Sequence, residues 1–311
     1  MPLFEIVKHN AAALEQSNFA TEKELQSLVE RNLGTIFNCR LVASEYSTGA
    51  QHAGRIDTLA LSEDGNPVII EYKRSESSDL VNQSLFYLSW IDDHRGDFEL
   101  AAQRSLGGDV EVDWSNMRVI CIAPNFRKYD LHAVQVMGAN IELWQYRLYA
   151  KGLLYLEEVY RKSYAAFGKA ESSQKNPVMV EAGRKAAITR ASARYSFEKH
   201  TDGKPKRIRD LALSVEEFIM GLDPAMEEVP KKLYVAYRIS QNIACMIVHK
   251  GHVTLFLKID PKDVTSVPFN SRDVSGIGHY GTGDFEMVLK SQVDLDAAKP
   301  FIEMAYRKVG G

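Results

Sequence analysis

Apolar and polar positions follow two spacings along the first third of this chain. From residue 22 to 37 the apolar residues fall on one helical face, and Thr21 stands at the N-cap position with Glu24 three residues further on. Three short apolar segments then predict strands: 39–46, 55–61 and 67–73. The sequence Ser-Glu-Asp-Gly-Asn between the last two is typical of a turn. A helix followed by three strands is therefore expected.

Helix and strand patterns alternate in the next part of the chain. The segment "MRVICIAP" is almost wholly apolar, which is typical of a strand buried on both faces. The predicted elements are a helix at 77–94, a strand at 117–124, a helix at 127–138 and two strands within 140–159. The order is helix, three strands, helix, strand, helix and further strands, which indicates an α/β unit.

A second unit is expected after residue 205. Its predicted elements are a helix at 213–222, strands at 231–239, 243–259 and 284–290, and a closing helix at 293–309 capped by Asp294. The predicted domain organisation is an α/β domain at 1–160, a basic linker at 161–204 and a smaller α+β domain at 205–311. A chain of 311 residues is long enough for two such cores.

Charge is unevenly distributed. The net charge of the chain is −3, yet residues 161–210 hold 13 Lys or Arg against 5 Asp or Glu. A basic segment in an otherwise acidic protein is a candidate contact for a polyanion such as nucleic acid. A solubilising linker without a binding role is the alternative.

The three cysteines are far apart, odd in number and without Cys-x-x-Cys spacing. They indicate reduced thiols and a cytoplasmic protein. No apolar run approaches the length needed to span a bilayer, and the N-terminus does not have the pattern of a secretory signal, so no membrane partner is expected.

Three charged residues lie in strands that otherwise read as buried: Asp57, Glu71 and Lys73. Glu71 and Lys73 are two residues apart and share a strand face. Asp57 stands opposite Glu71 only if the connecting loop is odd-numbered and centred on Asp64. A two-residue Asp64-Gly65 turn would instead pair Asp57 with Tyr72.

Two adjacent carboxylates form a site for a hard cation, Mg²⁺ or Mn²⁺, with Asp57 and Glu71 as the metal ligands. Such a cation supports phosphodiester hydrolysis, and Lys73 would orient or deprotonate the attacking water or stabilise the developing charge. The alternative is an ordinary cross-strand salt bridge.

This pattern resembles the signature of the PD-(D/E)XK nuclease superfamily. Gly54 to Asp57 reads "GRID", similar to the superfamily's G-x-I-D variant, thirteen residues separate Asp57 from "EYK", and Gln83 to Tyr87 matches Q-x-x-x-Y. The resemblance covers about residues 20–125. It implies a restriction-endonuclease-like mixed sheet flanked by helices, a Mg²⁺-dependent deoxyribonuclease activity, and a supporting catalytic role for Gln83.

The superfamily often adds a glutamate from its first helix, and Glu22, Glu24 and Glu30 compete for that role. At 100° per residue, Glu22 lies about 50° from the centre of the apolar face, and the other two lie more than 100° away. We therefore expect Glu22 to join Asp57, Glu71, Lys73 and Gln83 at the site, with three surface glutamates as the alternative.

The segment 205–311 resembles a domain of an uncharacterised family that follows PD-(D/E)XK domains. The expected function is a metal-dependent nuclease acting on nucleic acid, with DNA as the expected form and a homodimer as one option. Two rival functions stay open: a catalytically silent nucleic-acid-binding module, and a ligand-sensing or interaction protein dominated by the second unit.

Overall fold

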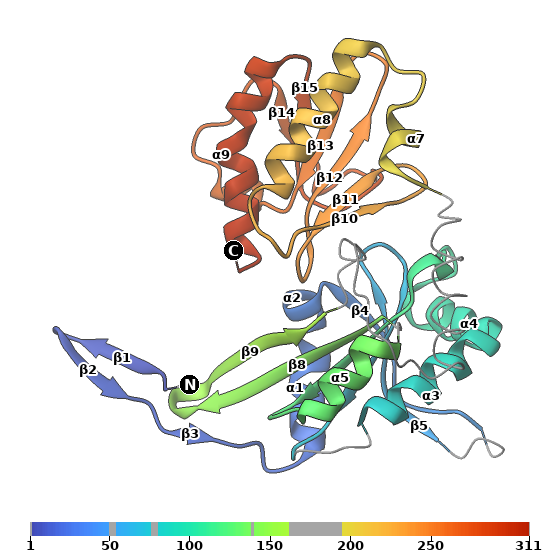
Figure 1. The fold of residues 1–311 in the computed structure, drawn as a ribbon, viewed down its shortest axis with the longest axis vertical. Coiled ribbons are helices and arrows are strands. Elements are labelled where there is room, and N and C mark those ends of the chain that lie inside the picture. The colour runs from blue at the N-terminus through green and yellow to red at the C-terminus, as the bar shows by residue number, and fades with distance from the viewer. Residues whose placement is uncertain (1, 50–53, 76–79, 138–139, 162–194, 311) are drawn as a thin grey trace, which may run out of the picture. The chain divides into compact units, whose positions relative to one another are not determined.

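The computed structural model describes residues 2–49, 54–75, 80–137, 140–161 and 195–310. Within them the chain forms two compact units, 2–161 and 195–310, coloured blue to green and yellow to red in Figure 1. Residues 162–194, which make up most of the predicted basic linker, lie outside the described residues.

A seven-stranded mixed sheet forms the centre of the first unit, in the order β3-β8-β7-β6-β5-β4, with β9 paired to β8. Pairing is antiparallel among β4, β5 and β6, parallel from β6 through β7 to β8, and antiparallel at β3 and β9. The strands are β3 (Gln16–Ser17), β4 (Cys39–Ser47), β5 (Arg55–Ser62), β6 (Pro67–Tyr72), β7 (Arg118–Ala123), β8 (Ile141–Tyr149) and β9 (Leu153–Tyr160).

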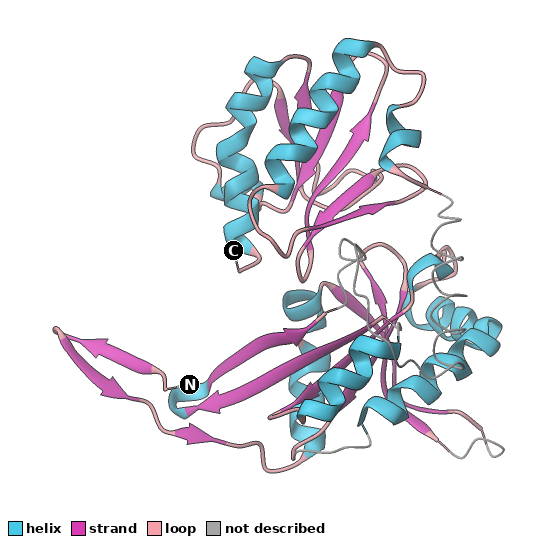
Figure 2. Ribbon diagram, viewed as in Figure 1, coloured by secondary structure: helices cyan, strands magenta, loops and turns pink. Residues whose placement is uncertain are grey.

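Helices cover this sheet on both faces (Figure 2). They are α1 (Glu22–Arg31), α2 (Leu33–Phe37), α3 (Leu80–Asp93), α4 (Arg95–Leu106) and α5 (Lys128–Met137). Leu25 of α1 packs in one core with Ile70 of β6, and Ile91 of α3 packs in the other with Ile69. Adjacent residues of β6 thus enter opposite cores, as the two-residue period of a strand requires. The expected restriction-endonuclease-like architecture, a mixed sheet flanked by helices, is confirmed.

Three local features of the first unit were not predicted. The helix expected at 22–37 breaks at Asn32, whose φ of −120° and ψ of 21° leave the helical region, so that α1 and α2 are separate. The helix α4 and the hairpin formed by β1 (Phe4–Val7) and β2 (Asn10–Ala13) are additional.

The turn between β5 and β6 sets the register that the site depends on. Thr58 pairs with Ile70 and Leu61 with Pro67, so the loop is odd-numbered and centred on Asp64. The register that places Asp57 opposite Glu71 is therefore confirmed.

The second unit contains a six-stranded sheet in the order β10-β11-β12-β13-β15-β14, antiparallel throughout. Its strands are β10 (Glu227–Pro230), β11 (Val235–Arg238), β12 (Asn242–Val248), β13 (Val253–Leu257), β14 (Ser271–Asp273) and β15 (Phe285–Leu289). Its helices are α7 (Phe197–Thr201), α8 (Lys206–Met220) and α9 (Gln292–Lys308).

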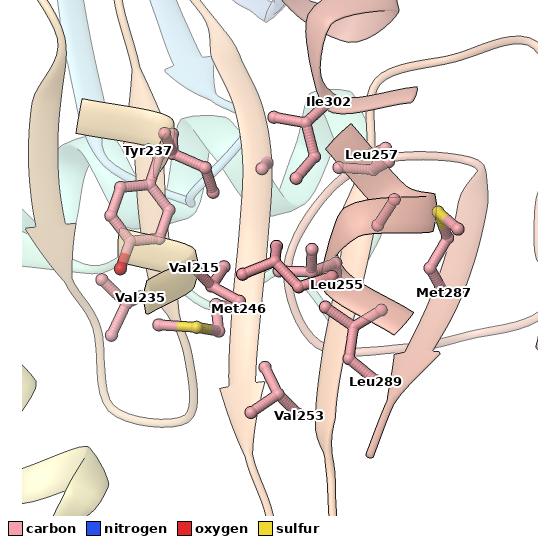
Figure 3. Close-up of a cluster of buried hydrophobic side chains, with 14 of the residues drawn as sticks. Val215, Val235, Tyr237, Met246, Val253, Leu255, Leu257, Met287, Leu289 and Ile302 are labelled. Atoms are coloured by element: carbon pink, nitrogen blue, oxygen red, sulfur yellow. The ribbon is translucent and has the colours of Figure 1, made fainter. Parts of the chain in front are cut away.

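One face of this second sheet forms the main core of the unit. Figure 3 shows Met246, Leu255 and Leu289 from the sheet together with Val215 of α8 and Ile302 of α9. All five are buried. The apolar face that each helix offers is thus covered by the sheet, which makes this an α+β unit.

Both long helices of the second unit differ in detail from the expectation. α8 begins at Lys206 rather than at residue 213, after Pro205, because its apolar face already starts at Ile208. α9 is capped by Ser291, and Asp294 occupies the third helical position of a capping box, so the expected cap at Asp294 was wrong. Within the described part of the chain, no helix has the length and hydropathy needed to cross a membrane.

Candidate active site

The site lies where β5 and β6 separate. Their ladder ends at the pair Thr58 and Ile70. Beyond this point β6 continues along β7, with Glu71 opposite Cys121, while β5 continues along β4, with Ile56 opposite Tyr46. The strands leave a gap in the sheet at the level of Asp57 and Glu71.

At this point, side-chain carboxylates accept the hydrogen bonds of backbone N–H groups that are not paired between β5 and β6. The Asp57 N–H donates to Glu71 Oε1 over 3.1 Å, and the Tyr72 N–H donates to Asp57 Oδ2 over 3.1 Å. Each acid therefore lies between the two strands and bonds to the opposite one. The other oxygen of Glu71, Oε2, is buried and has no hydrogen-bond partner. A buried acceptor without a partner is costly and rare in folded proteins.

Burial and like charge act together on this pair. Burial first, and then the charge of Asp57, raise the pKa of Glu71 to about 9, against the opposing effects of the Asp57 N–H and of Lys73. Burial also raises the pKa of Asp57, while the Tyr72 N–H and the Lys73 charge lower it. Without a compensating cation, the folded protein keeps Glu71 protonated at neutral pH.

Lys73 and Glu22 lie at the same end of β6. Lys73 is half-buried, and its Nζ lies 4.0 Å from Glu22 Oε1. Glu22 Oε2 accepts a hydrogen bond from the Arg74 N–H over 2.8 Å. Of the three candidate glutamates of α1, Glu22 is therefore the one that lies beside Lys73.

The other two glutamates have different partners. Glu24 Oε2 accepts from the Ala20 N–H over 2.8 Å at the start of α1. Glu30 Oε1 accepts from Thr58 Oγ1 over 2.7 Å and from Gln26 Nε2 over 2.9 Å. Glu24 stabilises a helix end, and Glu30 belongs to a polar network behind β5.

That network holds the backbone of the first acid. Gln26 Nε2 also donates to the Asp57 carbonyl oxygen over 2.7 Å, and Thr58 Oγ1 lies 3.2 Å from the Tyr72 hydroxyl. Gln26 is 3% exposed and Thr58 is fully buried. Buried polar chains of this kind fix the position of the groups they bond.

A cavity of about 470 Å³ opens in front of Asp57, lined by Glu22, Lys23, Gln26, Glu45, Arg55, Asp57 and Tyr72. Glu45 bonds two cations at its rim, Lys23 Nζ over 2.9 Å and Arg55 Nε over 2.6 Å. It does so with a φ of 55°, which is unusual for a residue with a side chain. The cavity thus presents both acids and cations to a ligand.

Gln83 is placed at the start of β5 rather than at the carboxylates. Its Nε2 donates to the Tyr87 hydroxyl over 3.0 Å, and that hydroxyl donates to the Arg55 carbonyl over 2.8 Å and accepts from the Arg55 N–H over 3.2 Å. A Cβ on Gly54 would approach Tyr87 Cε1 to 2.9 Å, so only glycine fits beside this ring. The Gln83–Tyr87 pair anchors β5 two residues before Asp57.

The donor set of the gap suits a hard divalent cation. It offers two carboxylates, one of which has a buried oxygen without a partner. Among the residues that the structure describes, no group of three His, Cys, Asp or Glu side chains is arranged to hold a metal ion. Mg²⁺ commonly takes one or two protein carboxylates and completes its shell with water and substrate phosphate, so the two acids fit it.

Three polar residues of the site were not predicted: Gln26, Glu45 and Thr58. The sequence contains one indication of Gln26: it is a polar residue beside the apolar positions of an amphipathic helix. Glu45 and Thr58 lie in strands without a motif, and only their side-chain contacts in the fold identify them.

Comparison with known proteins adds one domain assignment. Residues 197–308 match the sequence model of the family "Domain of unknown function (DUF5655)". The expectation that the C-terminal region belongs to an uncharacterised family is confirmed. The match begins at Phe197, where α7 begins.

A curated relative matches nearly the whole chain. It is an uncharacterized protein of Haemophilus influenzae (strain ATCC 51907 / DSM 11121 / KW20 / Rd), 27% identical over 311 residues, which cover 99% of this chain and 100% of the relative. The likeness thus runs the length of both chains, and the relative's description assigns no activity.

Two solved structures show distant similarity. One is a repair endonuclease from Pyrococcus abyssi, with 19% identity, a TM-score of 0.28, and coverage of 42% of this chain and 49% of that chain. The other is EndoMS in complex with double-stranded DNA, with 16% identity, a TM-score of 0.31, and coverage of 47% and 64%. The chain thus spans about half to two thirds of these structures, and at such scores the similarity assigns no activity to it.

Proposed function

We propose that this protein is a metal-dependent nuclease that hydrolyses phosphodiester bonds of nucleic acid. The observation that carries the proposal is the buried Glu71 Oε2 without a partner, beside Asp57, which itself lines the cavity. A protein that needed only stability would replace a buried acid beside a half-buried one by apolar residues. The motif resemblance gives DNA as the expected substrate.

Each residue has a distinct task in this proposal. Asp57 and Glu71 would hold Mg²⁺ or Mn²⁺, which when bound supplies activation of water and polarisation of a phosphoryl oxygen. Lys73 would place its ammonium at the reacting phosphate or its water. Glu22, 4.0 Å from Lys73 Nζ, would orient that ammonium. Gln83 would act through Tyr87, by positioning β5, rather than at the reacting atoms.

The buried thiols agree with the expected compartment. All three cysteines are free and buried, with no disulfide among them. A reducing environment such as the cytoplasm keeps thiols in this state, and we propose that location.

The direct test is cleavage of labelled single-stranded DNA, duplex DNA and RNA in Mg²⁺, Mn²⁺ or EDTA. We expect cleavage of at least one DNA substrate with either metal and none in EDTA. Lys73→Ala should lower kcat by about 10²–10³-fold with little change in substrate affinity, because the lysine acts in the transition state.

A matched control is Lys151→Ala. Lys151 is an exposed lysine that pairs with Glu5 at the β8–β9 turn, and its loss should leave cleavage unchanged. Titration of Mn²⁺ followed by calorimetry provides a second readout, with binding expected in the wild type and lost in Glu71→Gln. The proposal fails if the wild type cuts none of the substrates, or if Lys73→Ala cuts as fast as Lys151→Ala.

A further inference from the structure

One end of the second unit gathers cations from three separate segments. β13 begins at Val253, which pairs with Leu289, so the β12–β13 hairpin lies beside the end of β15. The start of α8 joins them, because the Arg207 guanidinium donates to the Lys290 carbonyl. In Figure 1, α8 and α9 begin at this same end of the unit. We call it the basic end, and it contains Lys204, Lys206, Arg207, His249, Lys250, His252 and Lys290.

This gathering is local, since residues 197–308 contain 16 Lys or Arg and 16 Asp or Glu. At the far end of α9 the cations are neutralised: Lys308 Nζ lies 2.7 Å from Asp263 Oδ2, and Arg307 Nη2 lies 3.0 Å from Glu303 Oε2. At the basic end, Lys206, Lys250 and Lys290 are exposed and have no carboxylate partner among the described residues.

Two acids near the basic end, Glu286 and Asp294, already have donors of their own. Glu286 Oε2 lies 2.8 Å from Arg272 Nη2. Asp294 Oδ2 accepts from the N–H groups of Lys290 and Ser291 over 2.8 and 3.0 Å. Neither acid forms an ion pair with the three exposed lysines.

Two histidines lie on either side of Lys250 in the β12–β13 hairpin. The rings of His249 and His252 stack with centroids 4.3 Å apart across the hairpin. The charge of Lys204 reaches His249, because it contributes with burial and with His252 to lowering the pKa of that histidine. The hairpin and the segment before α8 are thus close in space, and the cations form one surface.

An exposed aromatic residue lies next to this surface. Phe269 is 97% exposed, and it lines a cavity of about 460 Å³ together with Arg272, Lys290 and others. A phenylalanine this exposed contributes nothing to the core. Unpaired cations beside an exposed aromatic ring are the chemistry that binds a nucleic-acid strand, with lysines on phosphates and the ring stacked on a base.

We propose that the basic end of the second unit binds the sugar-phosphate backbone of nucleic acid, with Phe269 stacking on an unpaired base. The inference rests on the proposed function for the identity of the partner, and it gives the second unit the task of holding a single-stranded segment. It needs no contact with Asp57 or Glu71.

The test is equilibrium binding of a fluorescein-labelled single-stranded 30-mer and its duplex to the full chain in EDTA, at several salt concentrations. Lys206→Gln, Lys250→Gln and Lys290→Gln are combined in one variant. Its slope of log Kd against log salt for the single strand should be smaller by about two, from about 0.7 per lost phosphate contact. Phe269→Ala should weaken single-strand binding about fivefold or more and leave duplex binding unchanged.

The matched control removes three cations from the opposite end of the unit, in the variant Lys262→Gln, Arg307→Gln and Lys308→Gln. It should keep the wild-type salt slope. An unchanged slope in the first variant, an equal reduction in the control, or a wild type that binds neither probe would overturn the inference. Binding is measured without metal, so it is independent of cleavage. A protein that binds in this way but never cuts would contradict the proposed nuclease activity and still support nucleic-acid binding by the basic end.

Discussion

Two buried glutamates of the same sheet, Glu71 on β6 and Glu142 on β8, show opposite ways of burying a carboxylate. They are 0% and 1% exposed, and both strands neighbour β7. Glu142 Oε1 accepts from Arg118 Nη1 over 3.0 Å, and its Oε2 accepts from Trp144 Nε1 over 3.1 Å. Glu71 has a second acid as its neighbour and one oxygen without a partner.

This difference separates a buried carboxylate that stabilises the fold, Glu142, from one that is available to bind a ligand, Glu71. Arg118 lies on the strand next to Glu142 and compensates it within the protein; the charge of Glu142 raises the pKa of that guanidinium despite its burial. Nothing within the described residues compensates Glu71 in this way. A compensated pair is complete without a ligand, whereas an uncompensated pair favours binding a cation.

The largest expected effect concerns cleavage. Glu71→Gln should lower the rate at least about a hundredfold, because several kcal/mol of charge stabilisation depend on the bound cation. Glu142→Gln should retain the wild-type rate per folded molecule. Turnover of labelled DNA in Mg²⁺, normalised to the folded fraction, measures both. If both variants lost cleavage rate equally, Glu71 would have no role in cleavage beyond that of Glu142, and the comparison would fail.

The next effect concerns stability, and here Glu142→Gln should have the larger effect of the two substitutions. Glu142→Gln leaves Arg118 as a buried cation without a charged partner, which should cost about 3–5 kcal/mol in the free energy of unfolding. Glu71→Gln should not destabilise the metal-free protein at pH 7, because Glu71 is already neutral there. Urea unfolding in EDTA measures both, and a Glu71→Gln variant as unstable as Glu142→Gln would contradict the comparison.

A third effect is the pH dependence of stability in EDTA. Folding raises the pKa of Glu71 from 4.5 to about 9. Between these two pH values the folded protein therefore carries a proton on Glu71 that the unfolded protein has already lost. As far as this group is concerned, stability is highest and constant below about pH 4.5, falls as pH rises from there, and levels off above about pH 9. Glu71→Gln should flatten this decline in unfolding curves recorded from pH 5 to 9. A wild type as stable at pH 9 as at pH 6 would count against the buried, uncompensated acid.

The smallest effect concerns the anchor of β5. Tyr87→Phe removes the hydroxyl that bonds both backbone groups of Arg55, and should cost about 1–2 kcal/mol in unfolding free energy. It should also lower the cleavage rate, since Asp57 follows two residues later. Tyr129→Phe, at a tyrosine that is 83% exposed, is the control and should change neither quantity. The positioning role is lost if the two variants behave alike.

Much of the first unit could be predicted from the sequence because its elements carry strong periodic signals. Strands β5 to β7 are almost fully buried, and their apolar runs predict them directly. The helix α4 and the β1–β2 hairpin were not predicted, because few of their residues are buried. In α4 only Phe98 and Ala102 are buried, and the β1–β2 hairpin buries no residue at all, so neither leaves a periodic apolar pattern.

The sequence by itself placed Asp57 and Glu71 in adjoining strands, because strand period is a local property, and it left the parity of the connecting loop open. Only the tertiary structure decided that β5 and β6 separate at that point, which leaves Glu71 buried beside the half-buried Asp57, with one oxygen that has no hydrogen-bond partner. It also decided among the glutamates of α1, since Glu22 meets the Arg74 N–H across 52 residues of sequence. Such contacts depend on how a helix packs on a sheet, and helical periodicity fixes which face packs but not which partner it meets.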